Sequence, residues 1–537
     1  MTTGSAAVGL ALGLAMADHA ARTELARSVA GQGAVTFSAT TASSVTGSGT
    51  ASAGGGEEDA DADTPDGDGK TGVDKQIAAE RDHADGVAGS AGLGGSPSGE
   101  TPAAETSGGS VSAAAAVGIA LSSVTAEALF TGPVSITTPG TVTLSTDVDA
   151  DAAARGDGSA TDGGTAAIGV GVAITVSDVA NRAVVPGNLA ITAGGLTLHA
   201  GVDAGDGVST VTADSVAGAA GGVAVAGSVA IVLVDHVTTT SLVAGVTLTG
   251  GDLVLESEAS VAATATAEPA EVAGDSVGIG AALALLILDV DTTAVVGDGI
   301  GVTGARDVSL SATTTSAGTA TARIGAKGDV AVTPSVGIVL STVETTARIG
   351  TGAVPLSVGR DLSLAATQTA SATASGEGSA ESAGSAAVGV ALGLSIGNHR
   401  ALAVLERSVV AGRDVSLAAS SASSVAANGT ASAAGSEEQP GDGDEVGGKS
   451  GVDKQVAGQR GFADGVAGGR GLGTSGSAEP PSAQTSESES TVAVAAAVGV
   501  ALSTVEARTV IAGTVSTITA GGIVRLTTRA AADAAST

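Results

Sequence analysis

One uncharged apolar stretch sets the expectation for this fold: Val277-Gly278-Ile279-Gly280-Ala281-Ala282-Leu283-Ala284-Leu285. A strand that is covered on both faces reads as a continuous apolar run, so we expect this stretch to lie between layers. A polar turn is expected near residues 289–291, because acidic residues interrupt the apolar pattern there. A second strand, residues 292–296, then leads to the turn Gly297-Asp298-Gly299.

A third segment completes the unit and reveals a repeat. It begins at Val308-Ser309-Leu310 and passes into alternating Ser, Thr and Ala, as expected for a strand with one solvated face. The same three-residue pattern recurs along the chain: Val or Leu first, then any residue, then Leu or Phe. The last residues of its copies are Phe37, Leu144, Leu198, Leu255, Leu310, Leu364, Leu417 and Leu526. The steps are 107, 54, 57, 55, 54, 53 and 109 residues, so two units are doubled by an insertion into a repeat of about 55 residues.

A longer period overlies the short one. The hexapeptide Gly4-Ser5-Ala6-Ala7-Val8-Gly9 returns 380 residues later, and Gly72-Val73-Asp74-Lys75-Gln76 returns at residues 451–455. We therefore divide the chain into β-repeats and two copies of an acidic Gly/Ser-rich insertion, a lateral outgrowth in which residues 73–87 predict a short helix. The repeats are residues 1–53, 109–434 and 489–537, and the insertions are residues 54–108 and 435–488.

The composition favours an all-β repeat protein. The chain has 83 Gly, three Phe and no Trp, Tyr or Cys, so its core must consist of small and β-branched side chains in thin layers. We expect an elongated parallel β-solenoid with about 18 residues per turn, a rod on the order of 100 Å long. An antiparallel β meander is the alternative, because the polar joins could also serve as hairpins.

The net charge and the missing cysteines exclude several classes of function. With 22 Lys and Arg against 55 Asp and Glu, the formal charge of −33 repels nucleic acid and anionic membranes. Without Cys the chain has no disulfide, thiolate metal site or Cys nucleophile. Residues 216–234 carry no charge and are long enough to cross a membrane. Their Gly/Ala content and alternation nevertheless favour a strand, so we expect no membrane span.

Two motifs in the insertions invite chemical interpretations. Residues 443–450 fit the phosphate-loop pattern, but Asp444 and Glu445 stand where phosphate would bind, which favours a solvated loop. In the other insertion the spacing of carboxylates predicts weak calcium binding, because calcium takes six to eight oxygen ligands. A solvated acidic loop without bound metal is the alternative and is favoured. The five candidate calcium ligands are Asp59, Asp61, Asp63, Asp66 and Asp68.

The remaining polar residues predict no catalytic site, so we expect no enzyme and no other cofactor. His19, His236 and His399 each follow the first strand of a unit, which we interpret as use in turns rather than as a ligand cluster. Repeated Arg-Asp pairs such as Arg306-Asp307 predict surface ion pairs. Thr238-Thr239-Thr240 suggests a carbohydrate- or ice-binding face, although the matching position Ala401-Leu402 breaks the column of Thr.

The units resemble those of giant filamentous adhesins of bacteria, the haemagglutinin-like and leukotoxin-like surface proteins. The resemblance rests on three segments of the repeat unit. They are the apolar segment that opens a unit, residues 387–392, the turn at residues 294–299, and the segment that closes a unit, Gly412-Arg413-Asp414-Val415-Ser416-Leu417. It implies a secreted β-solenoid at the bacterial cell surface that forms a fibre and attaches to a surface ligand. We expect such a segment to continue in a longer chain or to associate end to end. A carbohydrate- or ice-binding β-solenoid is the alternative function.

Overall fold

The protein is a parallel β-solenoid. The computed structural model describes residues 6–53, 103–104, 111–130, 133–187, 189–202, 204–434, 482–486, 492–513 and 515–537. All pairs of adjacent strands in these ranges run parallel. The predicted all-β, parallel architecture is confirmed, and the antiparallel meander is wrong for the part of the chain that is described.

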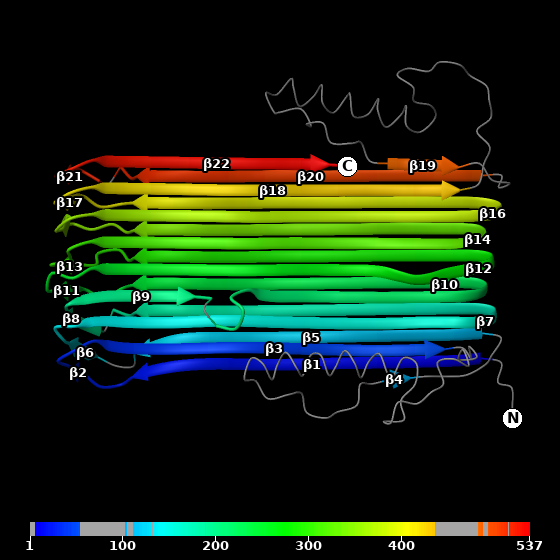
Figure 1. Ribbon diagram of the computed structural model, residues 1–537, viewed down its shortest axis with the longest axis horizontal. Helices are drawn as coiled ribbons and strands as arrows, with labels where there is room; N and C mark the ends of the chain where they lie inside the picture. Colours follow the sequence, from blue (N-terminus) through cyan, green and yellow to red (C-terminus); the bar gives the residue numbers. More distant parts are fainter. Residues whose placement is uncertain are drawn as a thin grey trace, which may run out of the picture.

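Long strands wind around the solenoid and form one 14-stranded sheet (Figure 1). They are β1 (Ala6–Leu25), β3 (Val35–Ala53), β5 (Val111–Phe130), β7 (Thr141–Val185), β9 (Gly195–Gly201), β10 (Ser209–Leu242), β12 (Leu253–Val296), β14 (Val308–Ile349), β16 (Leu362–Leu405), β18 (Val415–Ala434), β20 (Val492–Ile511) and β22 (Val524–Ser536). The same sheet includes the short strands β4 (Ala103–Ala104) and β19 (Ser482–Ser486).

Two small sheets close the solenoid at one end of the long strands (Figure 1). The first contains β2 (Val29–Ala30), β6 (Val134–Thr137), β8 (Leu189–Ala193), β11 (Val246–Leu248) and β13 (Val302–Thr303). The second contains β15 (Leu356–Val358), β17 (Val409–Ala411) and β21 (Ile518–Ala520). These short strands connect the end of one turn to the beginning of the next.

The longest strands fold back on themselves and so contribute to two layers. The first half of β16 pairs with β18, whereas its second half pairs with β20. The two halves of β14 likewise face each other, because Thr314 Oγ1 lies 2.6 Å from Thr345 Oγ1 and Ser335 Oγ donates to the carbonyl oxygen of Ala322 at 2.7 Å. We call the first half of each turn the outgoing arm and the second half the return arm.

Each repeat unit makes one turn, so the expectation of about 18 residues per turn is wrong. Val308 of β14 pairs with Leu362, 54 residues later, and Leu362 pairs with Val415. Eight stacked turns at about 4.8 Å each rise by only about 40 Å, whereas arms of about 20 residues extend for about 65 Å. The long axis of the molecule therefore runs along the strands (Figure 1), and the described residues do not form the predicted rod.

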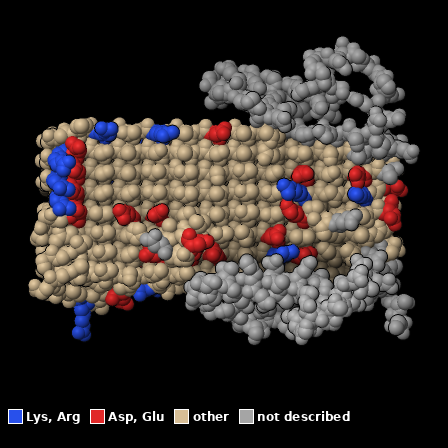
Figure 2. Space-filling view, viewed as in Figure 1, with Lys and Arg blue, Asp and Glu red and all other residues tan. Residues whose placement is uncertain are grey.

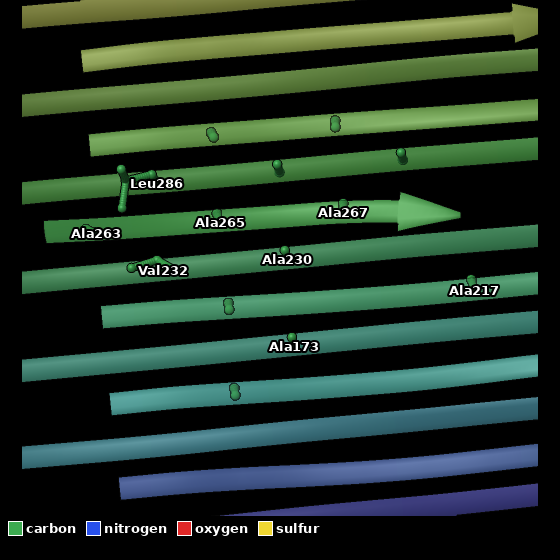
Figure 3. Packing of buried hydrophobic residues seen from close by; sticks show 14 of the residues in the cluster. Ala173, Ala217, Ala230, Val232, Ala263, Ala265, Ala267 and Leu286 are labelled. Atoms are coloured by element: carbon green, nitrogen blue, oxygen red, sulfur yellow. The ribbon is translucent and has the colours of Figure 1, made fainter. Parts of the chain in front are cut away.

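The interior tapers along the strands. Near the small sheets, Leu144, Leu198, Leu255 and Leu310 are fully buried and separate the two layers. Toward the other end the interior consists mainly of Ala, as Figure 3 shows. There a Cβ atom on Gly171 would lie 2.0 Å from the carbonyl oxygen of Val216 on the opposite arm. The backbones are in direct contact at this end, which is the thin packing that the composition predicts.

Several local expectations need correction. No turn occurs at residues 289–291, because β12 continues through them and Asp289 simply points outward from the strand. Residues 216–234 belong to β10, which pairs with β7 and β12. Across the described ranges there is no helix with the length and apolar character needed to cross a membrane. Of the insertions, the structure describes β4 and β19, which pair with β3 and β18, and the expected helix at 73–87 lies outside the described residues.

Candidate functional site

The candidate ligands and phosphate loop of the insertions lie outside the described residues. This applies to residues 443–450 and to the calcium candidates Asp59, Asp61, Asp63, Asp66 and Asp68. Where the structure is described, no group of three or more His, Asp or Glu side chains is arranged to hold a metal ion. Calcium binding by the acidic run therefore stays a prediction.

Three of the five histidines occupy one column of the return arms rather than turns. His19, His236 and His399 are linked by register through the strand partners between them. His236 and His399 are buried, whereas His19, on the first turn, is exposed. His399 contacts the hydroxyl groups of Ser341 at 3.1 Å and Ser423 at 2.6 Å. Neither ring nitrogen of the buried His236 has a hydrogen-bond partner. The prediction that these residues serve in turns is wrong.

Burial fixes the chemistry of the two interior histidines. It lowers the pKa of His236 and of His399 to about 4, because the interior disfavours the charged imidazolium. Both rings are therefore neutral near pH 7. His399 and Ser423 are in hydrogen-bond contact, but both are buried, so a substrate cannot reach the hydroxyl. The contact satisfies polar groups in the core and does not form a nucleophile with an exposed site.

A loop interrupts the outgoing arm between β9 and β10 and covers a carboxylate. Asp149 points outward from β7, and the loop buries it while the backbone N–H of Asp206 donates to its Oδ2 at 3.1 Å. Gly205 has a φ of +57°, and a Cβ there would lie 1.5 Å from Asp149 Oδ2. Burial and the nearby Asp151 carboxylate raise the pKa of Asp149 to about 6. The burial of Asp149 could not be predicted from the sequence, because Asp149 stands in an alternating pattern that is typical of solvated strand positions.

The Arg-Asp repeats form a ladder along one edge of the solenoid, visible as adjoining basic and acidic side chains at one end of the strands (Figure 2). The pairs join successive turns: Arg306 with Asp252, Arg360 with Asp307, and Arg413 with Asp361. The hydrogen bond from Arg360 lowers the pKa of Asp307 to about 2, and Asp307 also accepts from the backbone N–H of Asp361 at 3.0 Å. The interpretation as surface ion pairs is confirmed.

One buried cation was not predicted from the sequence. The guanidinium of Arg407 lies at the end of the solenoid near the small sheets and donates to backbone carbonyl groups of two earlier turns. Its acceptors are the carbonyl oxygens of Gly297, Ile300, Gly350 and Thr351. The corresponding corners of the two preceding turns begin with Gly297 and Gly350 and contain no Arg, whereas Arg27 stands 380 residues before Arg407 in the longer repeat, so the signal was an Arg at a corner. Arg407 stabilises the corner.

The two arms present opposite outer surfaces. Outward positions of the outgoing arms are mostly Ser, Thr and Ala, and charged groups are sparse on the face shown in Figure 2. Outward positions of the return arms form three columns of large aliphatic residues, which we call the aliphatic face. The columns are Leu12, Val117, Val172, Val229, Leu283, Val336, Leu392 and Val498; Leu14, Ile119, Ile174, Ile231, Leu285, Ile338, Leu394 and Val500; and Met16, Leu121, Val176, Leu233, Ile287, Leu340, Ile396 and Leu502.

The last turn leaves interior positions uncovered. Val524 and Leu526 of β22 are 44% and 47% exposed, whereas Val415 and Leu417, their partners one turn earlier, are fully buried. Within the described residues β22 pairs with β18 alone, so its other edge presents free N–H and C=O groups. The last described turn thus has the geometry of an inner turn, but no further strand pairs with it in the described residues.

Comparison with protein-family models, with curated proteins and with solved structures finds no match to this chain.

Proposed function

We propose that this chain is a structural, non-enzymatic segment of a long extracellular bacterial fibre or adhesin. Its turns form the body of the fibre and carry surfaces for attachment. The single observation that carries the proposal is the parallel register of successive turns, which is constant within each arm and shifts only near the junction of the two arms. Such a stack can be lengthened by any number of further turns without a new kind of contact.

The free edge of β22 has the pairing geometry of an inner strand. A second copy could pair with this edge in the existing register. Apolar interior side chains such as Leu526 add a hydrophobic contribution to that contact. The absence of Trp and Tyr and the small number of Phe do not weaken a stack of this kind, because thin layers of Ala and Val build it.

The proposal predicts association through the open end. We expect the chain to form linear assemblies whose mean mass rises with concentration, measured by light scattering and seen as extended particles in negative-stain images. Leu526→Lys should suppress this growth, because it places a charge over the interior of the last turn.

Thr527→Lys is the matched control, because Thr527 neighbours Leu526 on β22 but takes the outward-facing register position. It should leave the growth of assemblies intact. If the native chain gives the same low mass at every concentration, or if both variants behave alike, association through this end is refuted.

A carbohydrate- or ice-binding face is the second candidate. Thr238 and Thr240, which suggested it, are fully buried in the interior and cannot serve. The outgoing arms instead carry a column of outward-facing hydroxyl groups on four successive turns, about 4.8 Å apart. The column consists of Thr212, Thr264, Thr319 and Thr373.

This second candidate has its own test. If the Thr column binds ice or polysaccharide, the native chain should show thermal hysteresis or should co-sediment with an insoluble polysaccharide. Thr264→Lys should abolish the effect by breaking the flat array, whereas Thr527→Lys, outside the column, should not. A native chain without either activity excludes this function.

A further inference from the structure

The aliphatic face is the largest feature of the described surface that the proposed fibre does not use. Large aliphatic side chains stand on the outside of the return arms, and several of the interior positions between them are small, such as Gly171 and Ala230. The side chains of this face retain solvent exposure even on inner turns, where Ile287 is 39% exposed. Apolar side chains thus lie on both faces of these arms, since Val232 and Leu286 are buried in the interior.

Together with two neighbouring columns, the aliphatic face exceeds ordinary apolar surface patches in size. Two further columns beside it, which start at Val8 and Leu10, contain only Val, Ile, Leu, Ala, Gly and Pro. Five columns about 6.6 Å apart and eight turns about 4.8 Å apart cover about 900 Å². The largest apolar patch of a typical monomer is about 300–600 Å². Parallel sheets are, moreover, normally covered on both faces, and here one face is open in the described residues.

We propose that the aliphatic face and its two neighbouring columns form the interface of a homodimer in which two copies pack sheet against sheet. A specific interface of standard size buries about 800 Å² on each partner, which the five columns supply. Flat sheets of Val, Leu and Ile pack about 10 Å apart with interdigitated side chains, as in a β-sandwich. Because the columns repeat on every turn, the face is complementary to itself, which a two-fold symmetric interface requires.

Other occupants fit the surface less well. Sugars need hydrogen-bonding groups and aromatic rings, and the three columns of the aliphatic face contain neither. A membrane surface attracts interfacial Trp and Tyr, which the chain lacks, and anionic lipids repel a chain with a charge of −33. A second copy needs neither group, because aliphatic contact alone buries its face.

The charges beside the face give the dimer a recognisable salt dependence. The next outward column contains four carboxylates and no basic residue: Asp18, Ser123, Asp178, Asp235, Asp289, Thr342, Asn398 and Thr504. Two acidic copies repel each other, while the contact itself is apolar. Raising the salt concentration from about 0.1 M to about 1 M screens the repulsion and should therefore strengthen dimerisation.

Sedimentation velocity over a concentration series tests the proposal. In the background of Leu526→Lys, which is expected to suppress end association, we expect a monomer–dimer equilibrium that shifts toward dimer in high salt. Adding Ile231→Lys and Leu285→Lys, which lie side by side on the face, should weaken dimerisation at least about tenfold, the equivalent of about 1.4 kcal/mol. The matched control is Thr319→Lys with Thr373→Lys, which lie side by side on the outgoing arms and should leave the dimer unchanged.

A cysteine variant supplies a second readout that does not rely on charge in the sheet. The chain has no Cys, so a single Leu285→Cys should form a disulfide-linked dimer on mild oxidation, and Thr319→Cys should not. A Leu526→Lys chain that stays monomeric in high salt, or that binds neutral lipid vesicles through this face instead, overturns the proposal. The outcome is independent of the fibre proposal, since end association alone gives open-ended assemblies and face packing stops at two copies.

Discussion

Replacing Gly171 by Val is expected to destabilise the solenoid by about 3 kcal/mol or more. The Cβ atom of residue 171 would lie 2.0 Å from the carbonyl oxygen of Val216 and 2.8 Å from that of Gly156. Both atoms belong to the backbone of outgoing arms, so no side-chain rotation can relieve the overlap. The two layers would have to separate over several turns, which would open the Ala-filled interior. Chemical denaturation, followed by circular dichroism, measures the loss.

Gly227→Val is the matched control. Gly227 lies on β10 next to Val170 in register and points outward, and a Cβ atom added to it would meet no heavy atom within 4 Å beyond its own residue and its two chain neighbours. Valine suits an exposed strand position better than glycine, so the stability should be unchanged or higher by up to about 1 kcal/mol. Equal losses for the two variants would show that the strands, rather than the close approach of the layers, determine the sensitivity to substitution.

Much of the fold was predictable because its signals are local. The phrase ending at Leu310 recurs with a constant period, and alternation along residues 308–322 indicates a strand. The number of residues per turn was not predictable from these signals. Asp289 and Asp291 looked like a turn, since charged residues interrupt an apolar run, but they occupy alternate outward positions of an unbroken strand. A turn and an unbroken strand can be distinguished here only from the strand pairing, which joins residues far apart in the sequence.

The surfaces were harder to predict than the strands. The apolar run from Val277 to Leu285 does form a strand, but the expectation that it lies between two layers is wrong for the described residues, where the outward-facing Ile279 is 37% exposed. The sequence does not say which face of such a strand meets the interior. The register answers this, because Ala284 is buried and Leu285 points outward. Asp149 and Arg407 were missed for a related reason: their burial depends on a loop and on corners of other turns, far away in the sequence.

Replacing His236 by Val is expected to raise stability and to reduce sensitivity to acid. Val179 and Val290 occupy the same column on the two adjacent turns, so a valine fits the local packing. The substitution removes two buried ring nitrogens that lack hydrogen-bond partners, which should stabilise the protein by about 1–3 kcal/mol at pH 7. His399→Val is the contrasting variant, because it leaves the hydroxyl groups of Ser341 and Ser423 without their ring partner. It should stabilise less or destabilise.

The pH dependence follows from the low pKa of His236 in the folded chain, about 4 against an ordinary histidine value of 6.5. Between these values the unfolded chain binds a proton that the folded chain does not, so the native protein loses stability as the pH falls through this window. The difference corresponds to about 3 kcal/mol for one histidine. Asp149 acts in the opposite direction, since its raised pKa means that the folded chain binds the extra proton below about pH 6. Comparing His236→Val with the native chain cancels the effect of Asp149. Denaturation midpoints at pH 7 and pH 4.5 should therefore differ less in the variant, and an equal difference in both proteins would show that His236 takes up its proton without unfolding.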